Sequence, residues 1–248
     1  NPFHQDDATI ITILQDELLP HLSTFNSPVL TLYFYGSGLR EEQKLRMNAL
    51  FKKTFPSGTI FLESDLLGAA RALCGREEGI ACILGTGANS CLYDGEKIVQ
   101  NTPPLGYVLG DEGSGAVLGR LFMNAIFKDP QFVEIRELYM KETGLTMPLI
   151  INKVYREPLA NRFLASTSSF IRQHLDNVLL RKLVKDNFRM FFQRNIVQYQ
   201  RKDLSIQAVG SIAWYYQQEF RETVMEEGYQ MVQILKTPIE RLIKLHLY

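Results

Sequence analysis

The segment Cys82–Gly95, CILGTGANSCLYDG, places two glycines, a threonine, an alanine and an asparagine between two apolar runs. The flanking runs are typical of buried strands, and a plain β-hairpin between them needs a turn of only two residues. A loop of small residues directly after a buried strand indicates that something approaches the backbone closely. Such a turn can leave successive backbone N–H groups free as a nest for phosphate oxygens, to which the Thr86 hydroxyl would add a donor. A glycine-rich hairpin turn without a ligand is the alternative.

The composition is that of a globular protein and argues against several partners. Of the 248 residues, 46% are hydrophobic and 22% charged, and Lys+Arg and Asp+Glu both total 27. Zero net charge offers no general attraction for nucleic acid, so none is expected as a partner. No apolar run approaches the roughly 20 residues that cross a bilayer, and no signal sequence opens the chain, so no membrane partner is expected. An odd number of cysteines without metal-ligand spacing predicts reduced thiols and a cytoplasmic location.

The order of the predicted elements indicates an α/β fold in two parts. The first part alternates helices and strands, which predicts right-handed crossovers in a largely parallel sheet; its elements are helix 6–22, strand 29–35, helix 40–55, strand 59–62 and helix 66–74. The second part opens with predicted antiparallel strands at 80–84, 90–93 and 97–99. Its remaining elements are helix 116–127, a mostly helical stretch 132–198, strand 204–209, helix 211–226, strand 230–235 and helix 238–247.

Three further positions have the chemistry of ligand sites. Asp65 lies between a strand and a helix, where it is either a helix N-cap or a carboxylate that accepts a proton from an attacking hydroxyl. The loop 110–115, GDEGSG, is a surface turn, a metal site or a contact for a polyhydroxyl ligand, and has too few acids for a calcium loop. Gly210-Ser211 joins a strand to a helix in the form that receives nucleotides. Ser211 as a simple N-cap is the alternative, since neither GxGxxG nor a P-loop is present.

The order of these motifs is more informative than any one of them. An acidic strand end is followed by a Gly-Thr-Gly hairpin, a GDEGS loop, a helical stretch and a VGS strand–helix turn. In this series the chain resembles the sugar-kinase branch of the actin-like ATPase superfamily, and within it the N-acetylglucosamine kinases and the related BadF/BadG/BcrA/BcrD ATPases. GTGAN and GDEGS are the most specific parts of the resemblance, which covers nearly the whole chain.

The resemblance implies two ribonuclease-H-like lobes around a cleft, with a helical insertion at about 132–198 in the second lobe. We expect an N-terminal lobe at 1–76, to which the closing helix 238–248 returns, and a nucleotide-binding lobe at 77–237. The family opens with strands and a first phosphate loop that this chain does not contain, and we expect those residues to precede Asn1. The insertion is a candidate surface for homodimerisation.

By the same resemblance, the chain is an ATP-dependent kinase for an amino sugar, N-acetylglucosamine above all, with Mg²⁺ bridging the ATP phosphates. Asp65 matches the catalytic base and also a sugar contact. The second phosphate loop is matched by Gly85, Thr86 and Gly87, and the adenosine-binding turn by Gly210 and Ser211. The other positions that match sugar contacts are Asn1, Asn89, Asp111 and Gly115, and no protein ligand for a metal is predicted. Leu105 stands where animal N-acetylglucosamine kinases carry a tryptophan beside the sugar, which leaves the identity of the sugar open.

Three alternatives remain. An ATPase of the dehydratase-activator type would hold an iron–sulfur cluster through cysteines, but none of the three cysteines has a suitable pattern. A sugar-sensing regulator would carry a zinc motif or a DNA-binding helix-turn-helix, and neither is found in the sequence. A sugar-binding relative without catalytic activity stays open because the first phosphate loop is missing from the sequence.

Overall fold

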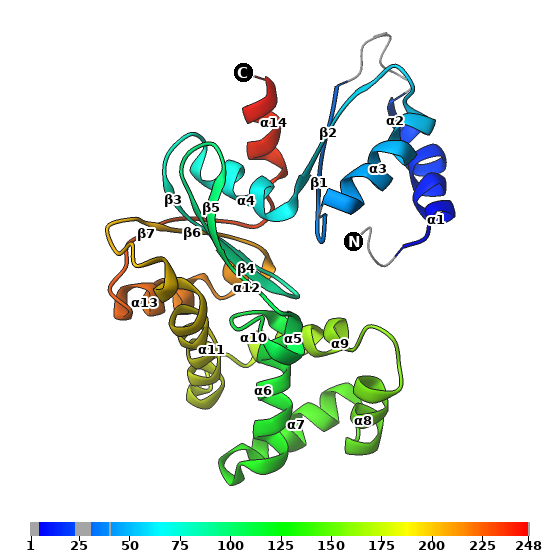
Figure 1. Cartoon of the computed structure of the whole chain (residues 1–248). Coiled ribbons are helices and arrows are strands. Elements are labelled where there is room, and N and C mark those ends of the chain that lie inside the picture. The colour runs from blue at the N-terminus through cyan, green and yellow to red at the C-terminus, as the bar shows by residue number, and fades with distance from the viewer. Residues whose placement is uncertain (1–4, 23–30, 40, 248) are drawn as a thin grey trace. The chain divides into compact units, whose positions relative to one another are not determined.

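The computed structural model describes residues 5–22, 31–39 and 41–247, and the chain forms two compact units, Asn1–Gly68 and Ala69–Tyr248 (Figure 1). The units divide inside helix α4 (Asp65–Cys74), somewhat before the boundary expected after residue 76. The last turn of α4 belongs to the second unit, where Gln207 Nε2 donates to the sulfur of Cys74 at 3.3 Å. Helix α14 (Ile239–Leu247) is grouped with the second unit, and its return to the first lobe stays a prediction.

The first unit is built on two parallel strands, β1 (Thr31–Gly36) and β2 (Thr59–Ser64). Their pairing runs in register from Thr31 opposite Thr59 to Gly36 opposite Ser64, so both carboxyl ends lie at one edge. Helix α3 (Glu41–Thr54) makes the crossover between them, and its buried face joins the core of the unit. The parallel arrangement predicted for this part is therefore confirmed over the described residues.

A bent helical segment completes the first unit. It consists of α1 (Asp7–Thr12), the π-helical turn η2 (Ile13–Leu18) and α2 (Leu19–Leu22). The side chain of Asp6 caps α1 by accepting the N–H of Thr9 at 2.7 Å. Ile10 and Leu14 bury their side chains in the same core as α3 and the two strands. The predicted helix 6–22 is thus present, with a π-helical turn that periodicity did not reveal.

The second unit contains a five-stranded sheet in the order β5-β4-β3-β6-β7. The strands are β3 (Gly79–Leu84), β4 (Ala88–Tyr93), β5 (Ile98–Thr102), β6 (Ile206–Val209) and β7 (Met231–Leu235). The first three are antiparallel, as predicted, whereas β6 runs parallel to both β3 and β7. Because Ile83 pairs with Val209, the carboxyl ends of β3 and β6 lie next to each other. Open α/β sheets place their ligands at such an edge.

Helices accompany this sheet, and those from α7 to η5 lie in the predicted insertion. They are α5 (Gly106–Leu109), α6 (Gly115–Lys128), η3 (Pro130–Phe132), α7 (Val133–Thr143), α8 (Met147–Tyr155), α9 (Ala160–Ser166), α10 (Ser168–Gln173), α11 (Val178–Phe191), η4 (Phe192–Ile196), η5 (Val197–Tyr199), α12 (Ser211–Tyr215) and α13 (Gln217–Glu226). In Figure 1 the insertion helices α7 and α8 lie at the far end of α6, away from the sheet. The aromatic side chains of α6, α7 and α10 pack together there, with the rings of Phe122 and Tyr139 5.2 Å apart.

The prediction of one continuous helix over 211–226 is wrong. The helix breaks at Tyr216, which has φ −114° and ψ 34° and separates α12 from α13. The Tyr216 side chain is only 1% exposed, and its hydroxyl donates to the carbonyl of Ser168 at 2.6 Å. This bond ties the break to the insertion. Helical periodicity cannot reveal such a bond, because its two partners lie far apart in the sequence.

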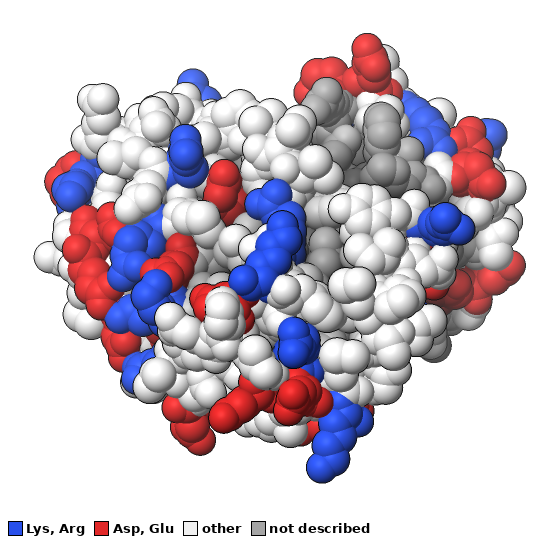
Figure 2. All heavy atoms as spheres, turned by 90° about the horizontal axis from the view of Figure 1, so that it is seen from below, with Lys and Arg blue, Asp and Glu red and all other residues white. Residues whose placement is uncertain are grey.

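Acidic and basic side chains are interspersed on the described part of the face drawn in Figure 2, with broad uncharged areas between them. This mixing accompanies equal totals of 27 Lys+Arg and 27 Asp+Glu. Mixed charges of this kind create no extended potential of one sign. None of the helices in the described ranges is long and apolar enough to cross a membrane.

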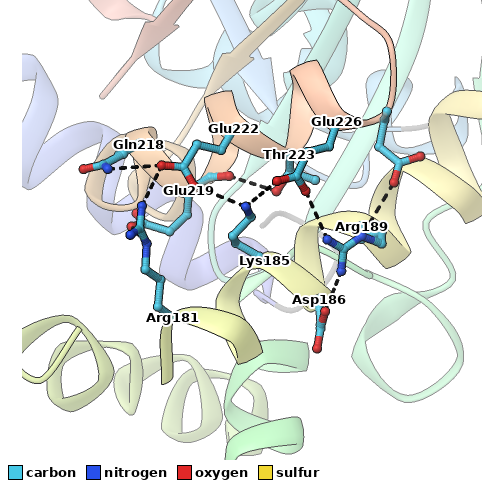
Figure 3. A network of polar contacts seen from close by, with 10 residues as sticks. Arg181, Lys185, Asp186, Arg189, Gln218, Glu219, Glu222, Thr223 and Glu226 are labelled. Carbon is cyan, nitrogen blue, oxygen red and sulfur yellow. Dashed lines mark hydrogen bonds and ion pairs between the residues drawn. The ribbon is translucent and has the colours of Figure 1, made fainter. Parts of the chain in front are cut away.

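Ion pairs connect α11 to α13 (Figure 3), and they are made by Arg181, Lys185 and Arg189 with Glu219, Glu222 and Glu226. Glu219 is the buried member, because its side chain is 5% exposed. Its Oε1 accepts from Nε of Arg181 at 3.1 Å. A buried carboxylate needs such a donor, whereas exposed ion pairs contribute little to stability.

We expect Arg181→Met to lower the free energy of unfolding by about 1–3 kcal/mol, because it leaves the buried Glu219 carboxylate without its donor. Lys182→Met is the matched control. Lys182 pairs with Asp186 on the same helix, its side chain is 72% exposed, and its loss should cost less than about 0.5 kcal/mol. Urea denaturation measures both values. Equal effects of the two substitutions would contradict the conclusion that the buried Glu219 carboxylate depends on Arg181.

Candidate functional site

The loop 85–87 connects β3 to β4 and is held against the N-terminus of α6. The Gly85 carbonyl accepts the N–H of Gly115 at 2.8 Å, and the Thr86 carbonyl accepts the N–H of Ala116 at 3.1 Å. These bonds satisfy two of the amides that a helix leaves open at its start. They also orient the loop, so that its carbonyls point to α6.

The loop amides differ in their partners. The N–H of Gly85 donates to the carbonyl of Gly87 at 2.9 Å. The N–H groups of Thr86 and Gly87 have no acceptor among the residues that the structure describes. Two successive free N–H groups form the kind of nest that binds phosphate oxygens. This arrangement supports the phosphate-loop interpretation of the sequence over that of a plain glycine turn.

Gly85 is not required by the fold itself. A Cβ built on Gly85 would meet no atom within 4 Å, and its φ lies outside the left-handed region. Gly87 is different, because a Cβ there would lie 3.0 Å from Oδ2 of Asp111. The glycine at 85 therefore keeps open a space that the protein does not fill. Space of this kind allows a ligand to approach the backbone closely.

Gly85 and Thr86 line a cavity of about 240 Å³. Its other walls come from α9, α10 and the start of α12, and the full lining is Gly85, Thr86, Arg162, Ala165, Ser166, Ser168, Ser211 and Ile212. Four hydroxyl groups and a guanidinium, with no carboxylate in the lining, provide donors suited to an anion. The cavity thus brings the predicted phosphate loop together with Ser211 of the predicted adenosine-binding turn.

Gly210 positions the start of α12 beside loop 85–87. It has φ +124°, and a Cβ there would lie 2.4 Å from the carbonyl oxygen of Leu84, the residue before Gly85. Only glycine allows both this backbone conformation and this approach. The predicted turn Gly210-Ser211 therefore owes its place to the close contact between the ends of β3 and β6.

Asp111 lies at the start of the GDEGS loop, in a left-handed conformation with φ 55°. Its carboxylate lies over Gly87 and accepts hydrogen bonds from the backbone N–H groups of Ala88 and Gly106. Asn89 is the next residue along β4, and its Oδ1 accepts the N–H of its neighbour in the chain at 2.9 Å. The structure thus places two of the predicted sugar contacts, Asn89 and Asp111, beside the end of loop 85–87.

The other predicted sugar contacts lie elsewhere. Gly115 is buried, and a Cβ there would lie 3.1 Å from Cδ1 of Ile212 and 3.2 Å from Cβ of Ala165, which both line the cavity. It therefore lies behind the cavity wall that carries Gly85. Asn1 lies outside the described residues. Leu105, at the position of the family tryptophan, is 63% exposed and has φ 62°.

Burial raises the pKa of Asp111 to about 6. In the unfolded chain an aspartate has a pKa of about 3.9, so the folded state holds this proton more tightly. The contribution of Asp111 to stability is therefore highest below about pH 4, and it is lost as the pH rises to about 6. We expect Asp111→Asn to gain stability relative to wild type over this range and then to level off. Urea denaturation of both proteins at several pH values measures this difference, and a difference independent of pH would contradict the prediction.

Two asparagines hold the GDEGS loop and were not identified from the sequence. Asn187 of α11 is 0% exposed; its Oδ1 accepts the N–H of Gly113 at 3.1 Å, and its Nδ2 donates to the carbonyl of Ser114 at 3.2 Å. Asn195 Nδ2 donates to Oε2 of Glu112 at 3.3 Å. Buried amides with both groups bonded fix the conformation of a loop. The sequence signal that could have revealed Asn187 is a polar residue on an otherwise apolar helix face.

In the first unit, Asp65 is the first residue of α4 and follows the carboxyl end of β2. Ser64 is the N-cap of this helix, because its Oγ accepts the N–H of Leu67 at 3.2 Å. The Asp65 carboxylate accepts the N–H of Leu66 at 2.9 Å and the hydroxyl of Ser37, and burial raises its pKa. The capping role considered for Asp65 thus belongs to its neighbour. Asp65 keeps the position of a partly buried carboxylate at a strand end.

The chain matches a protein of known structure from Porphyromonas gingivalis that is provisionally named an N-acetylglucosamine kinase. The two are 44% identical with a TM-score of 0.93, and the match covers 99% of this chain and 87% of the other. The chain belongs to the N-acetylglucosamine kinase family. A protein from Chromobacterium violaceum with the same provisional name is 15% identical, with a TM-score of 0.68 over 97% of this chain and 87% of its own, and shows likeness in fold. No protein-family profile and no curated protein matches the sequence.

Membership of the N-acetylglucosamine kinase family confirms the resemblance inferred from GTGAN and GDEGS. The structure also confirms the predicted α/β fold class, with a helical insertion in its second part. The family is one of ATP-dependent carbohydrate kinases. The roles of individual residues remain predictions, and the cavity described above is the geometry that supports them.

The three cysteines of this kinase-family chain are buried. Burial raises the pKa of Cys74 and Cys91 to about 12, and that of Cys82 well above its usual value. Such thiols stay protonated, whereas metal ligation needs the thiolate. Among the described residues, no three side chains of His, Cys, Asp or Glu are grouped to hold a metal ion. No observation favours the iron–sulfur alternative over the kinase.

Proposed function

We propose that the chain phosphorylates an amino sugar with ATP, and that N-acetylglucosamine is the acceptor. The observation that carries the proposal is the cavity shared by the phosphate loop and Ser211, with an open space over Gly85 and two unpaired loop amides. The choice of acceptor is supported by the 44% identity to the provisionally named N-acetylglucosamine kinase.

The second unit binds the nucleotide in this proposal. The N–H groups of Thr86 and Gly87 and the Thr86 hydroxyl bind phosphate oxygens, while Gly210 and Ser211 contact the adenosine. The cavity of about 240 Å³ lies below the roughly 300–1,000 Å³ of sites that enclose a whole small molecule, so it holds part of the nucleotide. Its lining offers hydroxyl oxygens and no carboxylate, which fits a Mg²⁺ ion carried mainly by phosphates and water. The ion neutralises charge on the phosphates when bound.

Asp65 is the proposed base. Its carboxylate takes the proton of the sugar hydroxyl, whose oxygen bonds to the γ-phosphorus while the bond to the β–γ bridging oxygen breaks and ADP leaves. The raised pKa of Asp65 makes the carboxylate a better proton acceptor. Asn89 and Asp111 hydrogen-bond the sugar hydroxyls and orient them. The proposal requires Asp65 to reach the sugar hydroxyl that accepts the γ-phosphoryl group.

Gly85→Ala tests the nucleotide site. A methyl group at Gly85 meets no protein atom, so we expect thermal stability close to wild type. The same methyl occupies the space needed by the phosphates, so affinity for Mg²⁺-ATP should fall by about tenfold or more. Titration calorimetry measures ATP and sugar binding in the same variant, and unchanged sugar affinity is the internal control. Normal ATP affinity in a folded Gly85→Ala variant would remove the loop from the nucleotide site.

The activity itself is tested on the full-length protein. ADP release is measured with Mg²⁺-ATP and a panel of sugars: N-acetylglucosamine, N-acetylmannosamine, glucosamine and glucose. We expect N-acetylglucosamine to give the highest kcat/KM. A preference for glucose would refute the amino-sugar acceptor, and no ADP release with any sugar would refute the kinase assignment.

A further inference from the structure

One charged residue lines the proposed nucleotide cavity, and neither the sequence analysis nor the proposed mechanism gives it a role. Arg162 of α9 lies exposed at the cavity. Across residues 5–22, 31–39 and 41–247, no acid or acceptor pairs with its guanidinium. Two other cations of the insertion do have contacts, since Lys153 pairs with Glu157 at 3.3 Å and Arg172 lies over the ring of Tyr215 at 4.2 Å. Arg162 is a free cation in a place built for an anion.

The surroundings of Arg162 favour an anionic ligand. The cavity lining contains no carboxylate to neutralise the guanidinium, and its other polar side chains are hydroxyls. The unpaired amides of Thr86 and Gly87 belong to the loop that borders the same cavity. A guanidinium offers five N–H donors in a planar fork that matches phosphate oxygens in pairs. Charge and donor geometry both match a phosphate group.

The backbone that carries Arg162 is fixed relative to the phosphate loop. Helix α9 packs directly on α6, so closely that a Cβ on Gly119 would lie 2.0 Å from the carbonyl oxygen of Leu164. Helix α6 in turn holds the loop through its first amides. The chain of contacts from α9 through α6 to Gly85 keeps Arg162 at the cavity without an ion pair of its own.

We infer that Arg162 binds the nucleotide by pairing its guanidinium with the phosphate oxygens held at loop 85–87. The inference rests on the proposed function and adds a residue to the same site. It assigns to the helical insertion a part in nucleotide binding. The guanidinium supplies charge and hydrogen bonds to the phosphates, while the adenosine is held elsewhere in the site.

Four proteins test this inference: wild type, Arg162→Gln, Arg162→Lys and the control Arg156→Gln. Arg156 is also an exposed arginine of the insertion, but it does not line the cavity. ADP binding is measured by titration calorimetry, adenosine binding by ligand-observed NMR, and folding by thermal unfolding. We expect Arg162→Gln to weaken ADP by about tenfold or more and adenosine by less than about twofold. Arg162→Lys should retain part of the affinity for ADP, and the control should bind as wild type.

The outcomes separate this inference from the function on which it rests. Wild-type protein that binds neither ADP nor ATP would refute the proposed nucleotide site itself. If wild type binds ADP and Arg162→Gln binds it equally well, the inference is overturned and the kinase proposal stands. An equal loss of ADP and adenosine affinity would also overturn it. Adenosine has no phosphate, so the loss of a phosphate contact should not weaken its binding.

Discussion

Asp65→Asn is expected to lower kcat by about a thousandfold, while the affinities for ATP and sugar change by less than about threefold. An amide has nearly the size of a carboxylate and still accepts the N–H of Leu66, which Asp65 bonds at 2.9 Å. It cannot take a proton from the sugar hydroxyl, so the loss falls on the transfer step. Rapid-quench kinetics and titration calorimetry separate this step from binding.

The neighbour Ser64 provides the matched control. Its Oγ caps α4 by accepting the N–H of Leu67, so Ser64→Ala should cost about 1 kcal/mol of stability. Its kcat should remain close to wild type, because Ser64 has no part in proton transfer. A fully active Asp65→Asn variant would remove Asp65 from the role of base, whereas a comparable loss of kcat in Ser64→Ala would show that the asparagine acts through the helix start.

Gly210→Ala is expected to lower the free energy of unfolding by about 3 kcal/mol or more and to abolish ADP binding in the fraction that remains folded. A methyl group there would lie 2.4 Å from the Leu84 carbonyl oxygen, in a backbone conformation with φ +124°. The ends of β3 and β6 would have to separate. The cavity that both strand ends build would then lose its shape.

Gly144→Ala is the control that separates the contact with the Leu84 carbonyl oxygen from the cost of a positive φ. Gly144 also has a positive φ, +68°, but a Cβ there meets no atom within 4 Å. Its substitution should therefore cost only about 1–2 kcal/mol and leave ADP binding unchanged. Urea denaturation and calorimetry on both variants give the comparison. Similar losses of stability at the two positions would show that backbone strain, and not the contact with Leu84, makes glycine necessary at 210.

Gly85 and Gly210, the two glycines of the proposed nucleotide site, are thus needed for opposite reasons. Gly210 is glycine because the protein itself occupies the space of a side chain, whereas Gly85 is glycine although that space is empty. A side chain at Gly210 would disturb a close backbone contact and so lower stability. A side chain at Gly85 would fill an empty space and so weaken ligand binding. The substitutions Gly210→Ala and Gly85→Ala should therefore differ in stability and agree in weaker nucleotide binding.

Much of the local structure followed from the sequence. The strand–glycine–strand pattern at 82–95 predicted the β3–β4 hairpin, and the alternation of helix and strand before residue 75 predicted the parallel pair β1–β2. These patterns depend on turn chemistry and on the spacing of apolar residues, which act over a few neighbours in the chain. The break at Tyr216 did not follow, because a bond to Ser168 decides it.

By itself, the sequence determined the class of fold and the family, through the order of its elements and motifs along the chain. It also determined the residue types of the proposed phosphate loop and of the strand-end carboxylate, because each of these is encoded in a short run of neighbours. Only the tertiary structure decided that Ser64 and not Asp65 caps α4, that Asn187 holds the GDEGS loop, and that Arg162 shares a cavity with Gly85 and Ser211. The places of Asn187 and Arg162 depend on contacts between segments far apart in the chain. The cap of α4 depends on which of two adjacent residues, both suited to a helix start, turns its oxygen to the helix amides. Spacing along the sequence carries no information about either.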